Sequence, residues 1–273
     1  MVRLIEVDGL GKAYGRGDGR TIAIAQVSFD VGEFEFVSVV GPSGCGKTTL
    51  LKCMSGLLTP TVGEARVAGK VVSEPPAELA IVFQDYSRSL FPWLSVRSNI
   101  ELPLRKKLAK PERRAIVDRV IEAVGLRSFG DHYPSQLSGG MQQRVAIARA
   151  LAYEPKVLLL DEPFASVDAQ TRATLEDLVL SLRQEFAITT LLVTHDIDES
   201  VYMSDRVIVL TRQPAVVRDM LTVDLPWPRD QIETKALPEF AELRARVYQE
   251  IMQAHRGDDL PSVDLAEGVA QVR

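Results

Sequence analysis

One stretch of this sequence limits the possible folds more than any other, the glycine-rich run GPSGCGKTT at residues 41–49. It satisfies the pattern G-x-x-x-x-G-K-S/T, follows the apolar run EFEFVSVV and precedes helical periodicity, which is the context that the pattern requires. In such a loop the backbone N–H groups close on phosphate oxygens, and the helix that follows adds its positive dipole end. A chance match arises in on the order of one chain in a hundred of this length. We therefore expect a phosphate-binding loop in an α/β fold.

The side chains of this loop have different predicted tasks. Lys47 supplies a positive charge to the β and γ phosphate oxygens, and the hydroxyl of Thr48 can ligate Mg²⁺. Cys45 is either a small residue lining a tight turn or a reactive thiol at a helix N-terminus, and we expect the first. The residues predicted to bind nucleotide here are Gly41, Pro42, Ser43, Gly44, Cys45, Gly46, Lys47, Thr48 and Thr49.

Hydrophobic periodicity places this loop among alternating strands and helices. The runs RLIEVDGL, TIAIAQVSFDV and EFEFVSVV predict N-terminal strands, with a turn at GRGDGR, residues 15–20. From residue 156 the order strand, helix, strand, helix, strand predicts a sheet with crossover helices. Residues 95–135 are charged, contain prolines and follow a helical pattern, so they predict a helical insert.

The C-terminal part of the chain predicts one more helix. Phe240, Leu243, Val247 and Ile251 recur at helical spacing, so we expect this helix to pack back on the body of the protein. We assign residues 1–230 to one domain with its helical part at about 88–152, and residues 231–273 to the terminal helix and a frayed tail that begins near residue 257.

Polar residues follow three of the predicted strands. The apolar run VLLLDEP ends in Asp161, which would hold Mg²⁺, and Glu162, which could orient or deprotonate the water that attacks a γ-phosphate. Gln84 in VFQDY follows a strand, and its amide can reach both the metal and the attacking water. His195 in VTHD also follows a strand, which favours a γ-phosphate contact. An isolated carboxylate pair or histidine is more often structural, but beside a phosphate loop the catalytic interpretation is favoured.

The stretch LSGGMQQ predicts a second anion site. Ser138, Gly139 and Gly140 open an amphipathic helix without large side chains, so free N–H groups and the positive dipole end point outward together. One chain with two phosphate sites raises the question of whose phosphate the second one binds.

The combined motifs resemble those of the ATP-binding cassette (ABC) ATPases, the nucleotide-binding subunits of ABC transporters, over residues 2–225. The resemblance implies a P-loop NTPase (RecA-like) α/β core with an N-terminal antiparallel β subdomain and an inserted helical subdomain carrying the LSGG signature. The motifs stand in the family's order: Tyr14 in KAYG, the phosphate loop, Gln84, LSGGMQQ, LLLDEP, the SVD of residues 166–168, and His195.

The resemblance also implies roles and partners. ATP and Mg²⁺ are the expected cofactors, with Thr48, Gln84 and Asp161 at the metal. Two copies would associate head to tail, so that Ser138, Gly139 and Gly140 cover the ATP held by the phosphate loop of the other copy. Single residues would act as follows: Tyr14 stacks on adenine, Gln84 senses the γ-phosphate, Glu162 is the catalytic base, His195 is the switch residue and Asp168 links the two active sites. Val167 stands where the family more often has Leu, a departure that concerns packing of the loop.

Composition restricts the possible partners and the compartment. The net charge of −5 and pI of about 5.4 give no electrostatic footprint for nucleic acid. Apolar runs fall short of the roughly 18 residues of a membrane span. Cys45 and Cys53 suit neither a disulfide nor a zinc site, and Cys53 fits a core position. We therefore expect a reduced compartment.

The resemblance also implies where the protein is located. It implies a peripheral position on the cytoplasmic face of the inner membrane, bound to an integral membrane permease.

A finer resemblance concerns the transported solute. FPWLSV, DEPFASVDAQTR and LPWPRD are similar to segments of bacterial nitrate, taurine, alkanesulfonate and bicarbonate importer ATPases. This implies ATP-driven uptake of a small anionic solute through a permease and, indirectly, a periplasmic solute-binding protein. Phe91, Pro92 and Trp93 lie in one turn that either docks the permease or packs the helical insert.

Two other functions fit part of the pattern. One is an ATPase of an exporter or lipid-trafficking complex, which the FPW turn and DEPFASVDAQTR disfavour. The other is a non-transport ATP switch acting on DNA or ribosomes. Repair ATPases place a long coiled coil between the phosphate loop and LSGG, whereas Lys47 and Ser138 are 91 positions apart here, and translation factors usually carry two cassettes. A P-loop kinase has no use for LSGG.

Overall fold

The computed structural model of this 273-residue chain describes residues 2–15, 19–85 and 89–256. The chain divides into two units, the first formed by residues 1–76 with 189–273 and the second by residues 77–188. Three predicted features fall outside the described residues: the middle of the GRGDGR turn, the first position of the helical insert at residue 88, and the C-terminal tail.

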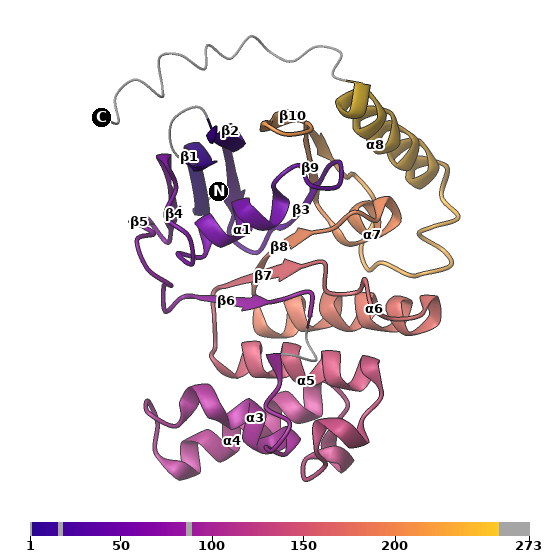
Figure 1. Cartoon of the computed structure of the whole chain (residues 1–273). Coiled ribbons are helices and arrows are strands. Elements are labelled where there is room, and N and C mark those ends of the chain that lie inside the picture. Colours follow the sequence, from indigo (N-terminus) through magenta and orange to yellow (C-terminus); the bar gives the residue numbers. More distant parts are fainter. Residues whose placement is uncertain (1, 16–18, 86–88, 257–273) are drawn as a thin grey trace. The chain divides into compact units, whose positions relative to one another are not determined.

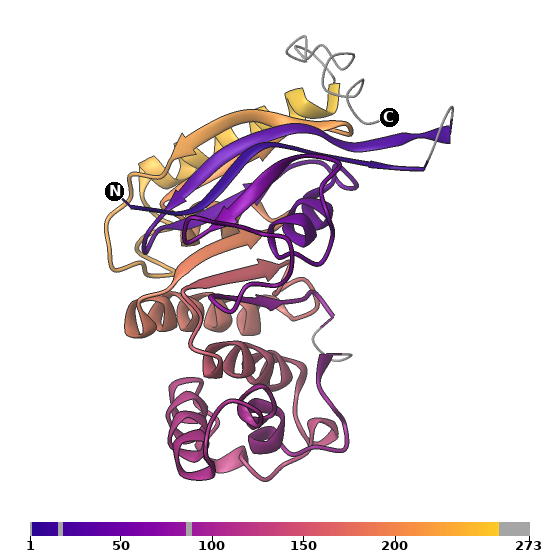
Figure 2. The same cartoon turned by 90° about the vertical axis from the view of Figure 1, so that its left-hand side faces the viewer.

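The first unit begins with an antiparallel sheet, as the N-terminal pattern predicts. Its strands are β1 (Arg3–Tyr14), β2 (Thr21–Gly32), β4 (Val62–Val67) and β5 (Lys70–Val71). β1 pairs with β2 on one side and with β4 on the other, and β4 pairs with β5 (Figure 2). In the second half of β2 burial alternates, with Val27, Phe29 and Val31 inside and Ser28 and Asp30 more exposed, which is typical of a sheet with one covered face.

The same unit contains a parallel sheet. β3 (Phe36–Val40) lies between β8 (Thr189–Val193) and β9 (Arg206–Leu210), and both pairings are parallel. All residues of β3 and β8 are buried, because strands covered on both faces have no solvent side. Parallel pairing brings the carboxyl ends of these strands to one edge, where the predicted phosphate loop and His195 follow.

Strand β10 (Ala215–Thr222) is absent from the predicted elements. It pairs with β9 in antiparallel fashion and with β2 in parallel fashion, so it joins the two sheets in the order β5-β4-β1-β2-β10-β9-β3-β8. Its charged residues obscure the strand pattern. The guanidinium of Arg218, inside this strand, donates to Glu250 of the C-terminal helix at 2.7 Å and also to Gln253.

Three helices of the first unit pack against its strands. α1 (Lys47–Met54) contacts β2, β4 and β8, and α7 (Ile197–Met203) contacts β3 and β9. α8 (Pro238–Arg256) contacts α7, β9 and β10 (Figure 1). Two residues of the predicted apolar spacing, Phe240 and Val247, are buried in α8.

The second unit combines two parallel strands with helices. β6 (Leu79–Val82) pairs with β7 (Val157–Asp161). α5 is central, because it contacts α3, α4, α6 and β6 (Figure 1). The helices are α3 (Val96–Glu101), α4 (Lys110–Ala123), α5 (Gly139–Ala152) and α6 (Ala169–Phe186), with 3-10 turns at Leu102–Leu104, Arg127–Phe129 and Pro134–Gln136. No helix in the described ranges is both long and apolar enough to cross a membrane.

An ion pair connects the beginnings of β3 and β9. Arg206 donates from Nε to Glu35 Oε1 at 2.5 Å and from Nη2 to Oε2 at 3.1 Å, and Nη2 also donates to the backbone carbonyl of Asp30. The two side chains are 24% and 16% exposed, so the pair is partly shielded from water. Its two-point geometry fixes the start of β9 against the start of β3.

We predict that Arg206→Met lowers the free energy of unfolding by about 2 kcal/mol, because Glu35 would lose charged hydrogen bonds in a partly buried place. Urea denaturation followed by circular dichroism measures the change. Arg66→Met is the matched control, since Arg66 and its partner Glu64 are 44% and 36% exposed and such pairs contribute about 0–1 kcal/mol. Equal losses in the two variants would contradict the account.

Candidate nucleotide-binding and catalytic site

The phosphate loop begins directly after β3 and needs glycine at two positions. Gly44 has φ +74° and Gly46 has φ +113°, a backbone region that L side chains rarely adopt. A Cβ on Gly46 would also lie 3.1 Å from the Ala23 carbonyl oxygen. Gly46 then caps α1, whose first hydrogen bond runs from Leu50 N to Gly46 O at 2.8 Å. The loop therefore turns sharply into a helix start whose N–H groups have no side chain above them.

Lys47 places its ammonium inside this loop. The residue is 6% exposed, and Nζ donates to the carbonyl oxygens of Gly41 at 2.8 Å and Pro42 at 3.2 Å. Ser43, Gly44 and Thr48 are exposed around it. A cation encircled by backbone, beside an open helix start, fits the phosphate groups of a nucleotide.

Tyr14 lies beside the same loop, as the sequence predicts. It ends β1, its hydroxyl is 3.4 Å from Thr49 Oγ1, and 43% of the residue is exposed. The ammonium of Lys12 lies 5.6 Å from the centre of the ring. An exposed aromatic ring at the rim of a phosphate loop can stack on a base, and adenine stacking remains a prediction for it.

His195 reaches the phosphate loop through strand pairing. Val39 of β3 is the register partner of Val193 of β8, and Gly41 and His195 lie two positions beyond these partners. The amide of Thr194 donates to the Val39 carbonyl at 3.2 Å, which continues the pairing up to the histidine. His195 is exposed at the sheet edge that carries the phosphate loop.

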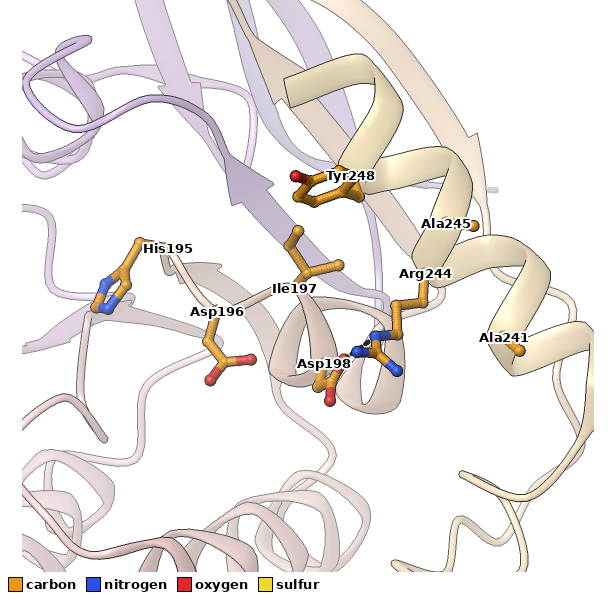
Figure 3. Close-up of a pocket in the computed structure, with 8 residues that line it drawn as sticks. All are labelled: His195, Asp196, Ile197, Asp198, Ala241, Arg244, Ala245 and Tyr248. Carbon is orange, nitrogen blue, oxygen red and sulfur yellow. Dashed lines mark ion pairs between the residues drawn. The ribbon is translucent and has the colours of Figure 1, made fainter. Parts of the chain in front are cut away.

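A cavity of about 670 Å³ adjoins His195 (Figure 3). Residues before and at the start of α7 form one side of it, and α8 forms the other. Asp198 and Arg244 join the two sides through an ion pair with a 2.9 Å contact. The lining residues are His195, Asp196, Ile197, Asp198, Ala241, Arg244, Ala245 and Tyr248.

The same strand-end geometry operates in the second unit. Val82 of β6 is the register partner of Leu160 of β7, so Gln84 and Glu162 again lie two positions beyond paired residues. Gln84 Nε2 donates to Glu162 Oε2 at 3.2 Å. The structure therefore brings the predicted base and the predicted γ-phosphate sensor into direct contact.

Glu162 has an unusual backbone. Its φ is +45°, in the left-handed region, where a non-glycine residue carries roughly 1–3 kcal/mol of strain. Asp161 just before it is 5% exposed, while Glu162 is half-buried. The left-handed turn thus separates two adjacent carboxylates into different environments, one inside the strand end and one directed to Gln84.

The predicted metal ligands are divided between the two units. Thr48 is in the first unit, and Gln84 and Asp161 are in the second. Hydroxyl, amide and carboxylate oxygens are the donors that Mg²⁺ prefers, so this set fits the ion chemically.

The signature segment opens α5, as predicted. Ser138 is the N-cap residue, and its hydroxyl accepts from Met141 N at 3.3 Å. Ser138 and Gly139 are exposed, but Gly140 is buried, and a Cβ there would lie 2.5 Å from Thr171 Cγ2. Gly140 is therefore required for packing of α5 on α6, and the exposed part of the predicted anion site is Ser138 and Gly139.

Asp168 caps α6. Its Oδ1 accepts from Thr171 N at 3.0 Å and its Oδ2 from Thr171 Oγ1 at 2.6 Å, and these bonds lower the pKa of the carboxyl below its ordinary value. Thr171 thus contacts both Asp168 and the Gly140 position, a role that the sequence analysis missed. The Asp-x-x-Thr spacing at a helix start was the available signal.

The predicted site residues thus form two sets, each assembled within one unit. The set in the first unit contains the predicted phosphate-binding residues, and the set in the second unit contains the predicted catalytic carboxylate and the signature segment. The first set is Tyr14, residues 41–49 and His195; the second is Gln84, Asp161, Glu162, Ser138, Gly139, Gly140 and Asp168.

Comparison with known proteins gives one family. The family described as ABC transporter matches residues 24–165. The nitrate import ATP-binding protein NrtC of Synechococcus elongatus is 44% identical over 244 residues, which cover 88% of this chain and 37% of the relative. The bicarbonate transport ATP-binding protein CmpC of the same species is 41% identical over 261 residues, 94% of this chain and 39% of the relative. This chain thus spans less than two fifths of the length of these relatives.

A solved structure shares the fold. The dimeric structure of a post-hydrolysis state of the ATP-binding cassette MJ0796, bound to ADP and Pi, superposes with a TM-score of 0.69 at 33% identity. The match covers 80% of this chain and 98% of that chain. The predicted P-loop NTPase fold is confirmed by this likeness.

The two thiols are buried. Cys45 is 1% exposed and Cys53 is 0% exposed. Burial raises the pKa of the Cys45 thiol, against the smaller opposite effect of the Lys47 ammonium, and burial raises the pKa of Cys53 to about 11. Because the thiolate is the nucleophile, the structure supports the interpretation of Cys45 as a small residue in a tight turn.

We predict that neither thiol reacts readily with iodoacetamide at pH 8 without nucleotide. At that pH about one Cys53 thiol in a thousand is ionised, against about one in four for an ordinary thiol, and burial slows the reaction of both cysteines further. Mass spectrometry of labelled peptides compares the native chain with the chain in guanidinium chloride, where both thiols are free. Native labelling of Cys45 at the unfolded rate would show that it is a reactive thiol after all.

Proposed function

The chain belongs to the ABC transporter family and is an ATPase, and from this premise we propose that it energises uptake of a small anionic solute through a separate permease. Two relatives are named for nitrate import and for bicarbonate transport, and both of these solutes are small anions. The name of the nitrate protein supports uptake as the direction of transport, and both names support the solute class. In this proposal the subunit lies peripherally on the cytoplasmic face of the cell membrane, and a periplasmic solute-binding protein supplies the permease.

The observation that carries the permease contact is an exposed aromatic pair. Trp93 is 70% exposed and Phe91 is 36% exposed, and their ring centres lie 5.4 Å apart. An indole with most of its surface in water contradicts the alternative that Trp93 packs the helical insert. Exposed aromatic residues held close together are typical anchors of a protein interface.

A buried amide holds this turn in shape. Asn99 of α3 is 0% exposed, and its Oδ1 accepts from Phe91 N at 2.9 Å. Its Nδ2 donates to the backbone carbonyls of Phe91, Leu94 and Ser95 at 3.1, 2.9 and 3.2 Å. A turn fixed by so many bonds to one side chain presents its aromatic residues with little loss of freedom on binding.

The turn that contains Phe91 and Trp93, here called the aromatic turn, also has a hydrogen-bonded link to α5, the helix that begins at the signature segment. Arg149 of α5 donates from Nη1 to the Ser89 carbonyl at 2.6 Å and from Nη2 to Ser89 Oγ at 2.9 Å. α5 begins at the signature, and Ser89 lies just before the aromatic turn. We infer that this contact transmits movement between the signature of one ATP site and the docked permease.

The hydrolysis step follows from the two sets of residues. Lys47 balances negative charge on the β and γ phosphates, and His195 at the same sheet edge donates to the γ-phosphate. Glu162 accepts a proton from the attacking water, whose oxygen bonds to the γ-phosphorus while the bond from that phosphorus to the bridging oxygen of ADP breaks, so that ADP and phosphate leave. Gln84 orients both the carboxylate and the water through its amide. Mg²⁺, when bound, supplies charge neutralisation on the phosphates, and Thr48, Gln84 and Asp161 would hold it.

A second copy of the chain completes each site in this proposal. Ser138 and Gly139 are exposed at the start of α5, where free N–H groups suit a phosphate. The MJ0796 cassette is dimeric, which supports a homodimer. In the proposed dimer the signature of one copy lies over the nucleotide of the other. ATP then joins the two copies, and hydrolysis releases them.

We predict that Glu162→Gln binds ATP, forms a stable dimer and lowers kcat by about 10²–10⁴-fold, since the amide keeps the shape but accepts no proton. Phosphate release measures turnover, and light scattering with ATP measures the dimer. Glu154→Gln is the matched control, because Glu154 also has a positive φ, of +53°, and is exposed after α5. Wild-type turnover in Glu162→Gln would remove Glu162 as the base.

We predict that Trp93→Ala lowers the amount of permease recovered with the subunit by at least about tenfold, since the anchor of the docking turn is lost. Tagged subunit is purified from native membranes in mild detergent, and mass spectrometry identifies its partners. Ile232→Ala removes a side chain of a residue that is 81% exposed in the other unit and should leave recovery unchanged.

The same purification separates the alternative functions. Recovery of a small multi-span permease, with a periplasmic solute-binding protein, supports import. An exporter or lipid-trafficking permease, ribosomes or DNA-repair proteins would overturn the importer proposal and leave the ATPase activity intact. Normal assembly of Trp93→Ala with a permease would remove only the docking role of the aromatic turn.

A further inference from the structure

A buried carboxylate lies close to His195 in sequence and has no assigned role. Glu199 in α7 follows His195 by four positions and is 4% exposed. Its Oε2 accepts from Thr194 Oγ1 at 2.6 Å, and Thr194 is itself 1% exposed. A buried carboxylate is unfavourable unless hydrogen bonds satisfy it, so this short bond is a specific feature of the turn.

The hydrogen bond from Thr194 to Glu199 determines which role the Thr194 hydroxyl has in a second hydrogen bond. A threonine hydroxyl has a single proton, and here it is donated to Glu199, so the oxygen lone pairs remain free to accept. Asp196 N donates to the same Thr194 Oγ1 at 3.0 Å. Glu199 therefore orients the hydroxyl that holds the amide immediately after His195.

Glu199 also contacts the other side of the turn. Its backbone N donates to Asp196 Oδ1 at 3.1 Å, so Asp196 caps α7 through Glu199. The side chain of Glu199 thus holds Thr194 and its backbone holds Asp196, which are the two neighbours of His195. His195 is exposed between two residues that one buried glutamate fixes, and Figure 3 shows its ring directed away from α8.

We propose that Glu199 is a positioning residue for His195, which it holds at the γ-phosphate through Thr194 and Asp196. The inference rests on the function proposed above for His195. Misplacement of a reacting contact by about 1 Å can lower a rate by roughly 10²-fold. Glu199→Ala should therefore lower kcat by about tenfold or more and leave the KM for ATP within about twofold, because the phosphate loop is unchanged.

Matched variants separate positioning from folding. Glu199→Gln keeps an oxygen that accepts from Thr194 and should recover most of kcat. Thr194→Val removes the hydroxyl at nearly constant shape, whereas Thr194→Ser retains the hydroxyl. If Glu199→Ala does not fold, these two Thr194 variants test the hydrogen bond between Thr194 and Glu199 instead. Thermal unfolding is measured for each variant, and kcat is compared only among those folded at the assay temperature.

A double-mutant cycle tests whether Glu199 acts through His195. kcat is measured for the wild type, Glu199→Ala, His195→Ala and the double variant. The proposal predicts that Glu199→Ala has almost no further effect once His195 is alanine. If Thr194→Val must replace Glu199→Ala, the same cycle is run with it.

The histidine ring gives a readout that stability alone does not move. The chain has three histidines, His132, His195 and His255, so proton NMR can resolve their ring signals. The His195 signals should shift in Glu199→Ala and return in Glu199→Gln, while those of His132 and His255 stay in place.

Three results would overturn the proposal, and they do so in two distinguishable ways. An equal loss of kcat from Glu199→Ala with and without His195, or unmoved His195 ring signals, would show that Glu199 does not act through the histidine. Wild-type turnover in His195→Ala would instead show that the function proposed for His195 is wrong, and the positioning role would fall with it.

Discussion

Parallel pairing of buried strands is the constraint on which the site depends. All residues of β3, β8 and β7 are buried, so exposed polar residues can stand only beyond the ends of these strands. Register then places the residues that follow. Val39 opposite Val193 brings the phosphate loop and His195 to one edge, and Val82 opposite Leu160 brings Gln84 to Glu162. One rule of sheet geometry thus assembles predicted site residues in each of the two units.

Local backbone conformation completes what strand pairing begins. Gly44 and Gly46 turn the chain into α1 so that its first N–H groups are open, and Glu162, which has a left-handed φ, directs its carboxylate to Gln84. At the start of α6, Thr171 joins the Asp168 cap and packs over Gly140. Residues that stabilise the fold therefore lie next to residues that are predicted to bind nucleotide. Several residues belong to both groups.

Local patterns predicted much of this structure, and tertiary contacts decided the rest. The strands predicted before the phosphate loop and after residue 156 are present in the structure, because apolar periodicity and the ends of strands can be recognised in the sequence alone. Strand β10 was missed because the partner of Arg218 lies on α8, far along the chain. The roles of Glu199 and Asn99 were not predicted. Both side chains are buried, and the hydrogen-bond partners that explain a buried polar side chain are known only once the fold is known. The predicted site residues assembled into two sets, and their individual roles remain proposals.

In the proposed dimer the phosphate loop of one copy works with the signature of the other copy, and mixing two inactive variants tests this arrangement directly. Lys47→Ala removes the phosphate-loop cation, and Gly139→Asp places a negative charge at the exposed start of α5, where it repels phosphate. Each variant alone should hydrolyse little ATP. Mixed in equal amounts, they form heterodimers with one intact composite site, so the account predicts up to about a quarter of the wild-type rate. A mixture no faster than the two variants measured separately would contradict it.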